Sequence, residues 1–170
     1  MTAATAGIEG AAVAGPEFRR FMRSWPTGVA VVTSAHGQAP VGCTVNAFVS
    51  VSLRPPLILI SLALTSRTLA AIGAAGAFGV NVLARTQPGL ARHFATSGDD
   101  RFTGLSYRWE YGVPLLAEAT ATAACVLERT ITVADHALVL GSPRWCACDH
   151  GRDPLVFAAG AYQAAIPVTG

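Results

Sequence analysis

The sequence has little charge and lacks any block of basic residues. Only 13% of its 170 residues are charged, and its twelve basic residues are scattered along the chain. The formal net charge is +2. Nucleic acids and anionic membranes are bound through clustered basic side chains, so this pattern points to neither partner. We therefore expect no nucleic acid and no membrane among the partners.

The sequence also lacks a hydrophobic run long enough for a membrane span. Its most apolar run, residues 57–64, is far shorter than the roughly 20 residues that a spanning helix needs. Residues 1–15 are rich in Ala and Gly but have neither the basic start nor the apolar core of a signal peptide. We predict flexible tails at residues 1–15 and 167–170 and a single domain at 16–166 of a cytoplasmic protein. The high apolar content of so small a domain predicts a homodimer.

The four cysteines do not make a disulfide framework, being few and irregularly spaced. Cys146 and Cys148, followed by Asp149 and His150, look like part of a metal cluster. A zinc site needs a second pair of ligands at suitable spacing, which the sequence does not offer. On a strand the two cysteines share one face, as ordinary packing requires. We predict no metal site.

Familiar catalytic and nucleotide-binding motifs are missing too. There is no GxSxG elbow, no GxxxxGK[ST] loop and no GxGxxG after a strand. A Rossmann-type nucleotide site is therefore excluded. Any nicotinamide cofactor would have to bind without that fold.

What the sequence does contain is mainly β pattern. A short amphipathic helix begins at Pro16, and two more are expected at about residues 65–72 and 86–94. The expected strands lie at residues 29–33, 41–45, 46–52, 57–63, 78–83, 107–111, 119–133, 137–148 and 155–162. We expect about six or seven strands in a closed or nearly closed antiparallel sheet, with the helices outside it.

The segment Leu64-Thr65-Ser66-Arg67-Thr68 follows a strand and starts a helix, with Thr65 or Ser66 as the cap. A helix N-terminus offers unpaired N–H groups and partial positive charge, and together these bind phosphate. Hydroxyls and a guanidinium add donors at the same place. An ordinary helix cap beside an exposed arginine is the alternative.

A second candidate is a ladder of small polar residues in strands that otherwise form a core. Unpartnered, such groups cost roughly 1–3 kcal/mol each, and a flat heteroaromatic ligand would partner them. A half-exposed sheet face is the alternative. The ladder consists of Thr44, Asn46, Ser50, Ser52 and Ser61.

His136 follows Asp135 at the start of a strand. A histidine beside a carboxylate serves as an acid, a base or a hydrogen-bonding anchor. The alternative is a turn residue with no chemical role.

Beyond these patterns, the chain resembles the short-chain flavin reductases with a flavin-binding split barrel, the reductase halves of two-component flavin monooxygenases. The resemblance runs from about Phe18 to Gln163. Its marks, in chain order, are Phe18-Arg19, residues 25–29, residues 42–48 with Ser50 and Ser52, residues 55–57, residues 66–68, residues 78–83, Phe94-Ala95, residues 100–102 with Gly104, Cys125, Asp135-His136, Pro154-Leu155, Gly160 and Tyr162. This ordered set favours the phosphate and ligand-ladder interpretations over their alternatives.

The chain departs from the family pattern at Ala134, where glycine is usual, and at Ser142-Pro143. Proline at that point predicts an edge strand or a bulge.

The resemblance implies a mainly β fold, a closed antiparallel split β-barrel with a few short flanking helices. It also implies a role for particular positions. The isoalloxazine ring and ribityl chain would lie along Thr44, Val45, Asn46, Ala47, Ser50 and Ser52. The flavin phosphate would be held by Ser61, Ser66, Arg67 and Thr68. Thr27, His93 and Phe94 would border the ring, while His136 and Tyr162 would lie where the nicotinamide stacks.

The implied activity is reduction of FAD or FMN by NADH or NADPH, with His136 as the catalytic residue. Hydride passes directly between stacked rings, so positioning dominates and neither a metal nor a nucleophile is needed. Reduced flavin would then leave for a partner monooxygenase. Two alternatives keep the fold: a pyridoxamine-phosphate-oxidase-like enzyme with retained FMN, and a non-enzymatic flavin-binding protein.

Overall fold

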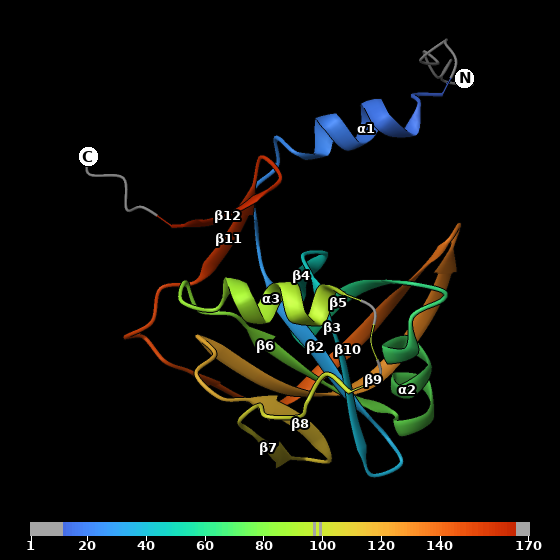
Figure 1. Ribbon diagram of the computed structural model, residues 1–170. Coiled ribbons are helices and arrows are strands. Elements are labelled where there is room, and N and C mark those ends of the chain that lie inside the picture. The colour runs from blue at the N-terminus through green and yellow to red at the C-terminus, as the bar shows by residue number, and fades with distance from the viewer. Residues whose placement is uncertain (1–11, 97, 99, 166–170) are drawn as a thin grey trace.

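The main body of the protein is a seven-stranded antiparallel sheet (Figure 1). The computed structural model describes residues 12–96, 98 and 100–165. Most of the first predicted tail and all of the second therefore lie outside the described residues. The sheet has the order β3-β2-β6-β9-β10-β5-β4. In chain order its strands are β2 (Ala30–His36), β3 (Ala39–Val45), β4 (Phe48–Leu53), β5 (Pro56–Ala63), β6 (Ala77–Val82), β9 (Ala121–Val133) and β10 (His136–Cys148).

The two edges of this sheet meet at one corner. The edge strands β3 and β4 are separated by only Asn46 and Ala47, so the sheet must curl until its edges come together there. The Ser61 N–H donates to the Ala47 carbonyl at 3.0 Å and fastens β5 to the corner. Beyond it β4 pairs with β5, and the described residues show no pairing of β4 with β3. The prediction of a closed barrel is therefore wrong in its closure, while its mainly β, antiparallel character is confirmed.

Two helices pack on the β3 side of the sheet. Helix α2 (Arg67–Ala75) contacts β2 and β3, and α3 (Pro88–Ala95) contacts β3. Of the two predicted caps, Ser66 is the one that caps α2, and Gly76 ends the helix in the left-handed conformation at φ 67°. The helix was expected to end at about residue 72, but it continues through Gly73 to Ala75.

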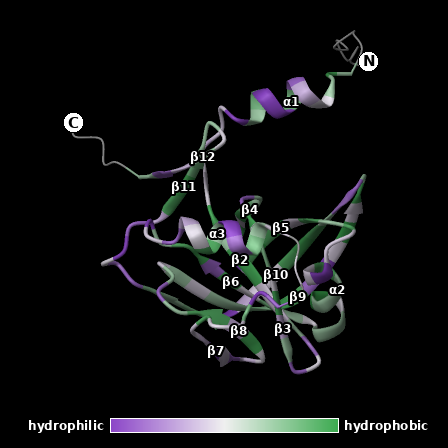
Figure 2. Cartoon of the chain, viewed as in Figure 1, coloured by the Kyte–Doolittle hydropathy of each residue, from purple (hydrophilic) through white to green (hydrophobic). Residues whose placement is uncertain are grey.

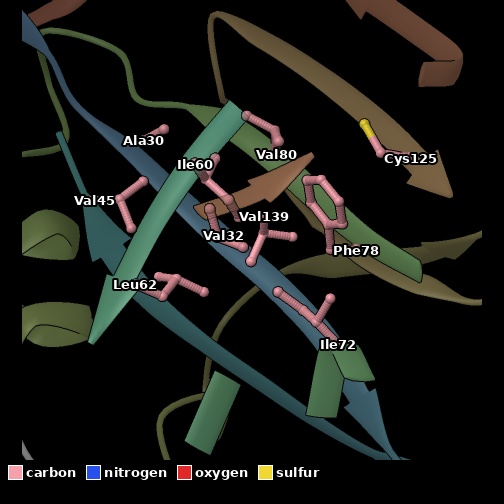
Figure 3. Close-up of a cluster of buried hydrophobic side chains, with 10 residues drawn as sticks. All are labelled: Ala30, Val32, Val45, Ile60, Leu62, Ile72, Phe78, Val80, Cys125 and Val139. Carbon is pink, nitrogen blue, oxygen red and sulfur yellow. The ribbon is translucent and has the colours of Figure 1, made fainter. Parts of the chain in front are cut away.

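The core lies between the curled strands and these helices. Figure 3 shows one cluster of it, in which Ile60, Ile72 and Phe78 are fully buried. In Figure 2 the strands of the body carry mostly hydrophobic colours. Close packing leaves no room for a side chain at Gly141, where a Cβ would overlap the Phe78 ring. This core holds the strands that position the candidate site.

An arm projects from the body (Figure 1). It contains α1 (Gly15–Met22) and a small sheet of order β1-β11-β12, from β1 (Thr27–Gly28), β11 (Leu155–Ala158) and β12 (Ala161–Ala164). A single strand over residues 155–162 was predicted, and that was wrong. Ala159 and Gly160 have φ angles of 53° and 82° and form the turn of a hairpin.

A second small hairpin, β7 (Tyr107–Glu110) with β8 (Val113–Leu116), lies against the body. The irregularity expected at Pro143 is confirmed: β10 pairs with β5 only as far as Gly141, and its register against β9 shifts between Pro143 and Trp145. Among the described residues, no helix has both the length and the apolar character to cross a membrane.

Candidate functional site

A cavity of about 440 Å³ opens at the free edge of β3. One wall is the β3 segment at residues 40–44, and a second is the start of α2 at residues 65–68. The end of α3 and the segment that follows it supply the third, through Phe94, Ala95, Gly98 and Arg101. Three segments distant in sequence thus enclose one space.

The backbone of β3 presents hydrogen-bonding groups to this space. The register of β3 against β2 is continuous. The backbone N–H and C=O groups of successive β3 residues therefore point alternately toward β2 and away from it. The Gly42 carbonyl accepts a hydrogen bond from the Arg101 side chain and so faces away from β2. Thr44, two residues on, therefore faces the same way with its N–H and C=O. An edge of this kind pairs readily with a planar ligand that has ring nitrogens and carbonyls.

The N-terminus of α2 supplies a site for an anion. The Ser66 hydroxyl accepts from the Leu69 N–H at 3.4 Å, and no acidic residue occupies the first turn. The remaining free N–H groups and the helix dipole favour negative charge here. Arg67 is exposed at this end and Thr68 is buried. The arrangement suits a phosphate group.

The α3 wall is held rigidly against β3. The Thr44 hydroxyl donates to the Ala91 carbonyl at 2.7 Å. Phe94 is 1% exposed, and its ring meets that of Phe102 edge-on at 5.1 Å. A Cβ at Gly42 would lie 3.2 Å from Phe94 Cε1, so glycine permits this close approach. The Phe94 ring therefore packs behind the cavity wall and fixes α3 against β3.

Cys43 also lines the cavity. Burial raises the pKa of its thiol, an effect partly offset by hydrogen bonds with Thr68 and Ser66 and by the charge of Arg101. The thiol is therefore protonated near pH 7 and is not an activated nucleophile.

Five of the predicted residues meet in this cavity: Thr44, Ser66, Arg67, Thr68 and Phe94. Others lie around the sheet corner without lining it. Val45 is buried in the core, while Asn46 and Ala47 are exposed at the turn beside β3. Ser50 and Ser52 lie on β4, and Ser61 on β5 is tied to Ala47 through its backbone.

The remaining predicted residues lie farther out. His93 does not line the cavity, and its Nε2 is 2.8 Å from the Arg101 carbonyl oxygen. Thr27 and Tyr162 belong to the arm. The Thr27 hydroxyl is buried without a partner among the described residues, and the Tyr162 ring packs beneath Arg92 at 5.3 Å.

His136 lies at the turn between β9 and β10, with its side chain 47% exposed. Its Nδ1 is 2.8 Å from Asp135 Oδ1, and this hydrogen bond lowers the pKa of the Asp135 carboxyl. The Asp135 carbonyl accepts from the Leu64 N–H, and the next residue, Thr65, lines the cavity. His136 is thus close in the fold to the α2 side of the cavity but is not part of its wall.

Sequence reasoning gave no role to seven lining residues, while Thr65, also in the wall, belonged to the predicted helix start. The seven are Pro40, Val41, Gly42, Cys43, Ala95, Gly98 and Arg101. For Arg101 a signal was present, because Asp100-Arg101-Phe102 is one of the marks of the family resemblance. Gly42, Cys43 and Ala95 also fall within these marks, whereas Pro40, Val41 and Gly98 do not.

Comparison with known proteins agrees with this geometry. The family model "Flavin reductase like domain" matches residues 22–165. A flavin reductase from Pseudomonas putida is 35% identical over 164 residues, covering 95% of this chain and 96% of that protein. A probable flavin reductase from Rhizobium meliloti is 37% identical over 142 residues; the match covers 82% of this chain but only 45% of that protein.

Solved structures give the same result. The NADH:FAD oxidoreductase SgcE6 of Streptomyces globisporus, in complex with NAD and FAD fragments, superposes with a TM-score of 0.85 at 34% identity, covering 92% of this chain and 98% of that one. The styrene monooxygenase flavin reductase of Pseudomonas putida S12 superposes with a TM-score of 0.82 at 30% identity. The match covers 89% of this chain and 99% of that one. On these matches, the chain belongs to the flavin reductase family.

Proposed function

We propose that this protein is an NAD(P)H:flavin oxidoreductase that reduces FMN or FAD and releases the reduced flavin to a flavin-dependent monooxygenase. The observation that carries the proposal is the cavity itself. It joins an unpaired strand edge, suited to a flavin ring, to a helix N-terminus suited to a phosphate.

The residues present suit a flavin nucleotide. The outward N–H and C=O of Thr44 and the outward N–H of Gly42 would meet the ring system, and Phe94 would border it. Ser66, Arg67 and Thr68 would hold the phosphate. When bound, flavin supplies an acceptor for the hydride that a reduced nicotinamide donates.

The chain's own contribution to the reaction is positioning. The described lining side chains include hydroxyls, two guanidinium groups and a protonated thiol. Hydride transfer between stacked rings needs no covalent help from these groups, so rigid walls and one accessible ring face are sufficient. His136 and Tyr162 are proposed to help hold the nicotinamide. Moderate affinity suits a reductase whose product must leave.

The relatives support both halves of the proposal. SgcE6 has been solved with fragments of NAD and FAD, and the Pseudomonas putida S12 structure is the reductase of a styrene monooxygenase. A partner monooxygenase that receives reduced flavin is proposed by the same argument. A cytoplasmic location is a separate proposal, with which the match to the flavin reductase family is consistent.

We further propose that the protein acts as a homodimer. Helix α1 has eight residues, none of them buried, and an isolated helix of that length is not stable in water. Phe18 and Phe21 are 56% and 70% exposed on it, and Trp25 just beyond is 67% exposed. Strand β4 also exposes Val49 and Val51. A second copy would cover these surfaces. Sedimentation at micromolar concentration should give twice the chain mass, and a monomer would contradict this.

The test of function is NADH oxidation followed at 340 nm with and without added flavin. Each of NADH and NADPH is combined with each of FMN and FAD, under air and anaerobically. We expect turnover only with added flavin, and stoichiometric flavin bleaching without oxygen. Activity carried by flavin that co-purifies and does not exchange would instead indicate a retained-FMN oxidase. Tightly bound flavin without NADH oxidation would indicate a non-enzymatic flavin-binding protein.

A further inference from the structure

Arg101 connects two walls of the cavity. One terminal guanidinium nitrogen, Nη1, donates to the Gly42 carbonyl of β3 at 2.7 Å and to the Phe94 carbonyl of α3 at 3.1 Å. Its own backbone carbonyl meets His93 Nε2 at 2.8 Å. One residue thus joins β3, the last turn of α3 and the segment that follows it.

The guanidinium is not fully satisfied by these bonds. Its Nε atom is buried and has no hydrogen-bond partner among the described residues. A buried donor left unpaired costs roughly 1–3 kcal/mol, more when it is charged, and native structures usually place a ligand or water there. The unpaired donor of Arg101 therefore marks a place for an acceptor.

Arg101 lines the same cavity as the N-terminus of α2. The positive charge of Arg101 lowers the pKa of the Cys43 thiol, although burial, the larger effect, raises that pKa. The described residues that Arg101 contacts by hydrogen bonding are backbone carbonyls and the His93 ring, so its charge is not neutralised by them.

We propose that Arg101 is a second cation of the phosphate subsite, acting with Ser66, Arg67 and Thr68 at the start of α2. Its free donor would meet a phosphate or pyrophosphate oxygen while Nη1 keeps α3 fastened to β3. Guanidinium suits this double task because its planar fork directs donors along several fixed lines. The inference rests on the proposed function, since it names a further residue for the same flavin nucleotide.

The experiment compares FMN with riboflavin, which lacks the phosphate. Dissociation constants are measured by flavin fluorescence for the wild type, for Arg101→Met and for Arg108→Met. The last variant removes the same charge from β7, outside the cavity. Thermal denaturation verifies folding of each variant. We expect Arg101→Met to raise the dissociation constant of FMN at least tenfold and that of riboflavin less than threefold. Arg108→Met should change neither constant. The slope of log Kd for FMN against log salt should also become shallower in Arg101→Met.

If Arg101 only held α3 against β3, the result would be different. The affinities for FMN and riboflavin would then fall by the same factor in Arg101→Met, and the proposal would be overturned. If Arg101→Met does not fold, Arg101→Lys decides. Lysine keeps the charge without the fork, so the riboflavin-to-FMN ratio of dissociation constants should fall severalfold, and an unchanged ratio would overturn the proposal.

The wild-type measurements separate this inference from the proposed function. Equal affinity for FMN and riboflavin would overturn the phosphate subsite but leave flavin reduction standing. A wild-type protein that binds no flavin at all would overturn both.

Discussion

Cys43 provides a test of the cavity that does not depend on activity. It is partly exposed within the cavity wall, whereas Cys146 and Cys148 are exposed on β10 and do not line the cavity. Cys125 is 2% exposed, and burial raises the pKa of its thiol to about 12. At pH 9 only about one Cys125 thiol in a thousand is ionised, so it should remain unmodified. We predict that bound FMN protects Cys43 alone.

The expected size of the protection follows from occupancy. At an FMN concentration 100 times its Kd, about 1% of sites are empty, so alkylation of Cys43 should slow about 100-fold. Because the pKa of Cys43 is raised, its rate without flavin should keep climbing at a pH where an ordinary thiol has begun to level off.

The assay is N-ethylmaleimide labelling at pH 8.5–9, resolved by mass spectrometry of tryptic peptides. Cleavage at arginine leaves Cys43, Cys125 and the Cys146/Cys148 pair in three separate peptides. The exposed pair is the internal control and should react equally fast with and without FMN. A Cys43 rate that saturating FMN does not change would refute the placement of flavin in this cavity.

Three further predictions concern single side chains. Ser66→Ala removes the α2 cap and should lower the free energy of unfolding in urea by about 1 kcal/mol. It should also lower the affinity for FMN. A variant as stable as the wild type would show that the Ser66 cap does not stabilise α2. Gly141→Ala forces a methyl group onto the Phe78 ring and should lower the free energy of unfolding by about 1–3 kcal/mol, whereas Gly28→Ala, with open space around it, serves as control. His136→Ala should raise the KM for NADH severalfold with little change in flavin affinity, and unaltered steady-state kinetics would exclude His136 from the nicotinamide site.

Local signals predicted local structure well. Ser66 starts a helix because its hydroxyl caps a free N–H group, and Gly76 ends that helix because glycine tolerates a positive φ. Strands β2 and β3 lie close to the ranges predicted at residues 29–33 and 41–45, because both ranges are rich in β-branched residues. These elements need only neighbours in sequence to specify them.

Features set by distant contacts were harder to predict. Strand β8 carries Pro114 and lacks alternation because all four of its residues are buried, so its pattern is not that of a half-exposed strand. Closure of the sheet was overestimated because it depends on where β4 goes after the Asn46–Ala47 corner.

The candidate site was predicted in part for the same reason. Thr44, Ser66, Arg67 and Thr68 have donors that suggest a phosphate or flavin ligand, and the structure brings them to one cavity. The position of Arg101 depends on hydrogen bonds to carbonyls 59 and 7 residues away. The motif Asp100-Arg101-Phe102 marks the residue but does not show that its side chain reaches this cavity.

The central claim is that the cavity between β3, α2 and α3 binds a flavin nucleotide. Calorimetric titration of FMN into the wild type and Arg67→Ala tests it most directly. We predict one FMN per chain, with affinity about 10- to 100-fold lower in the variant because a charge-assisted hydrogen bond contributes about 1.5–3 kcal/mol. No heat of binding in the wild type, or equal affinity in both proteins, would contradict the claim.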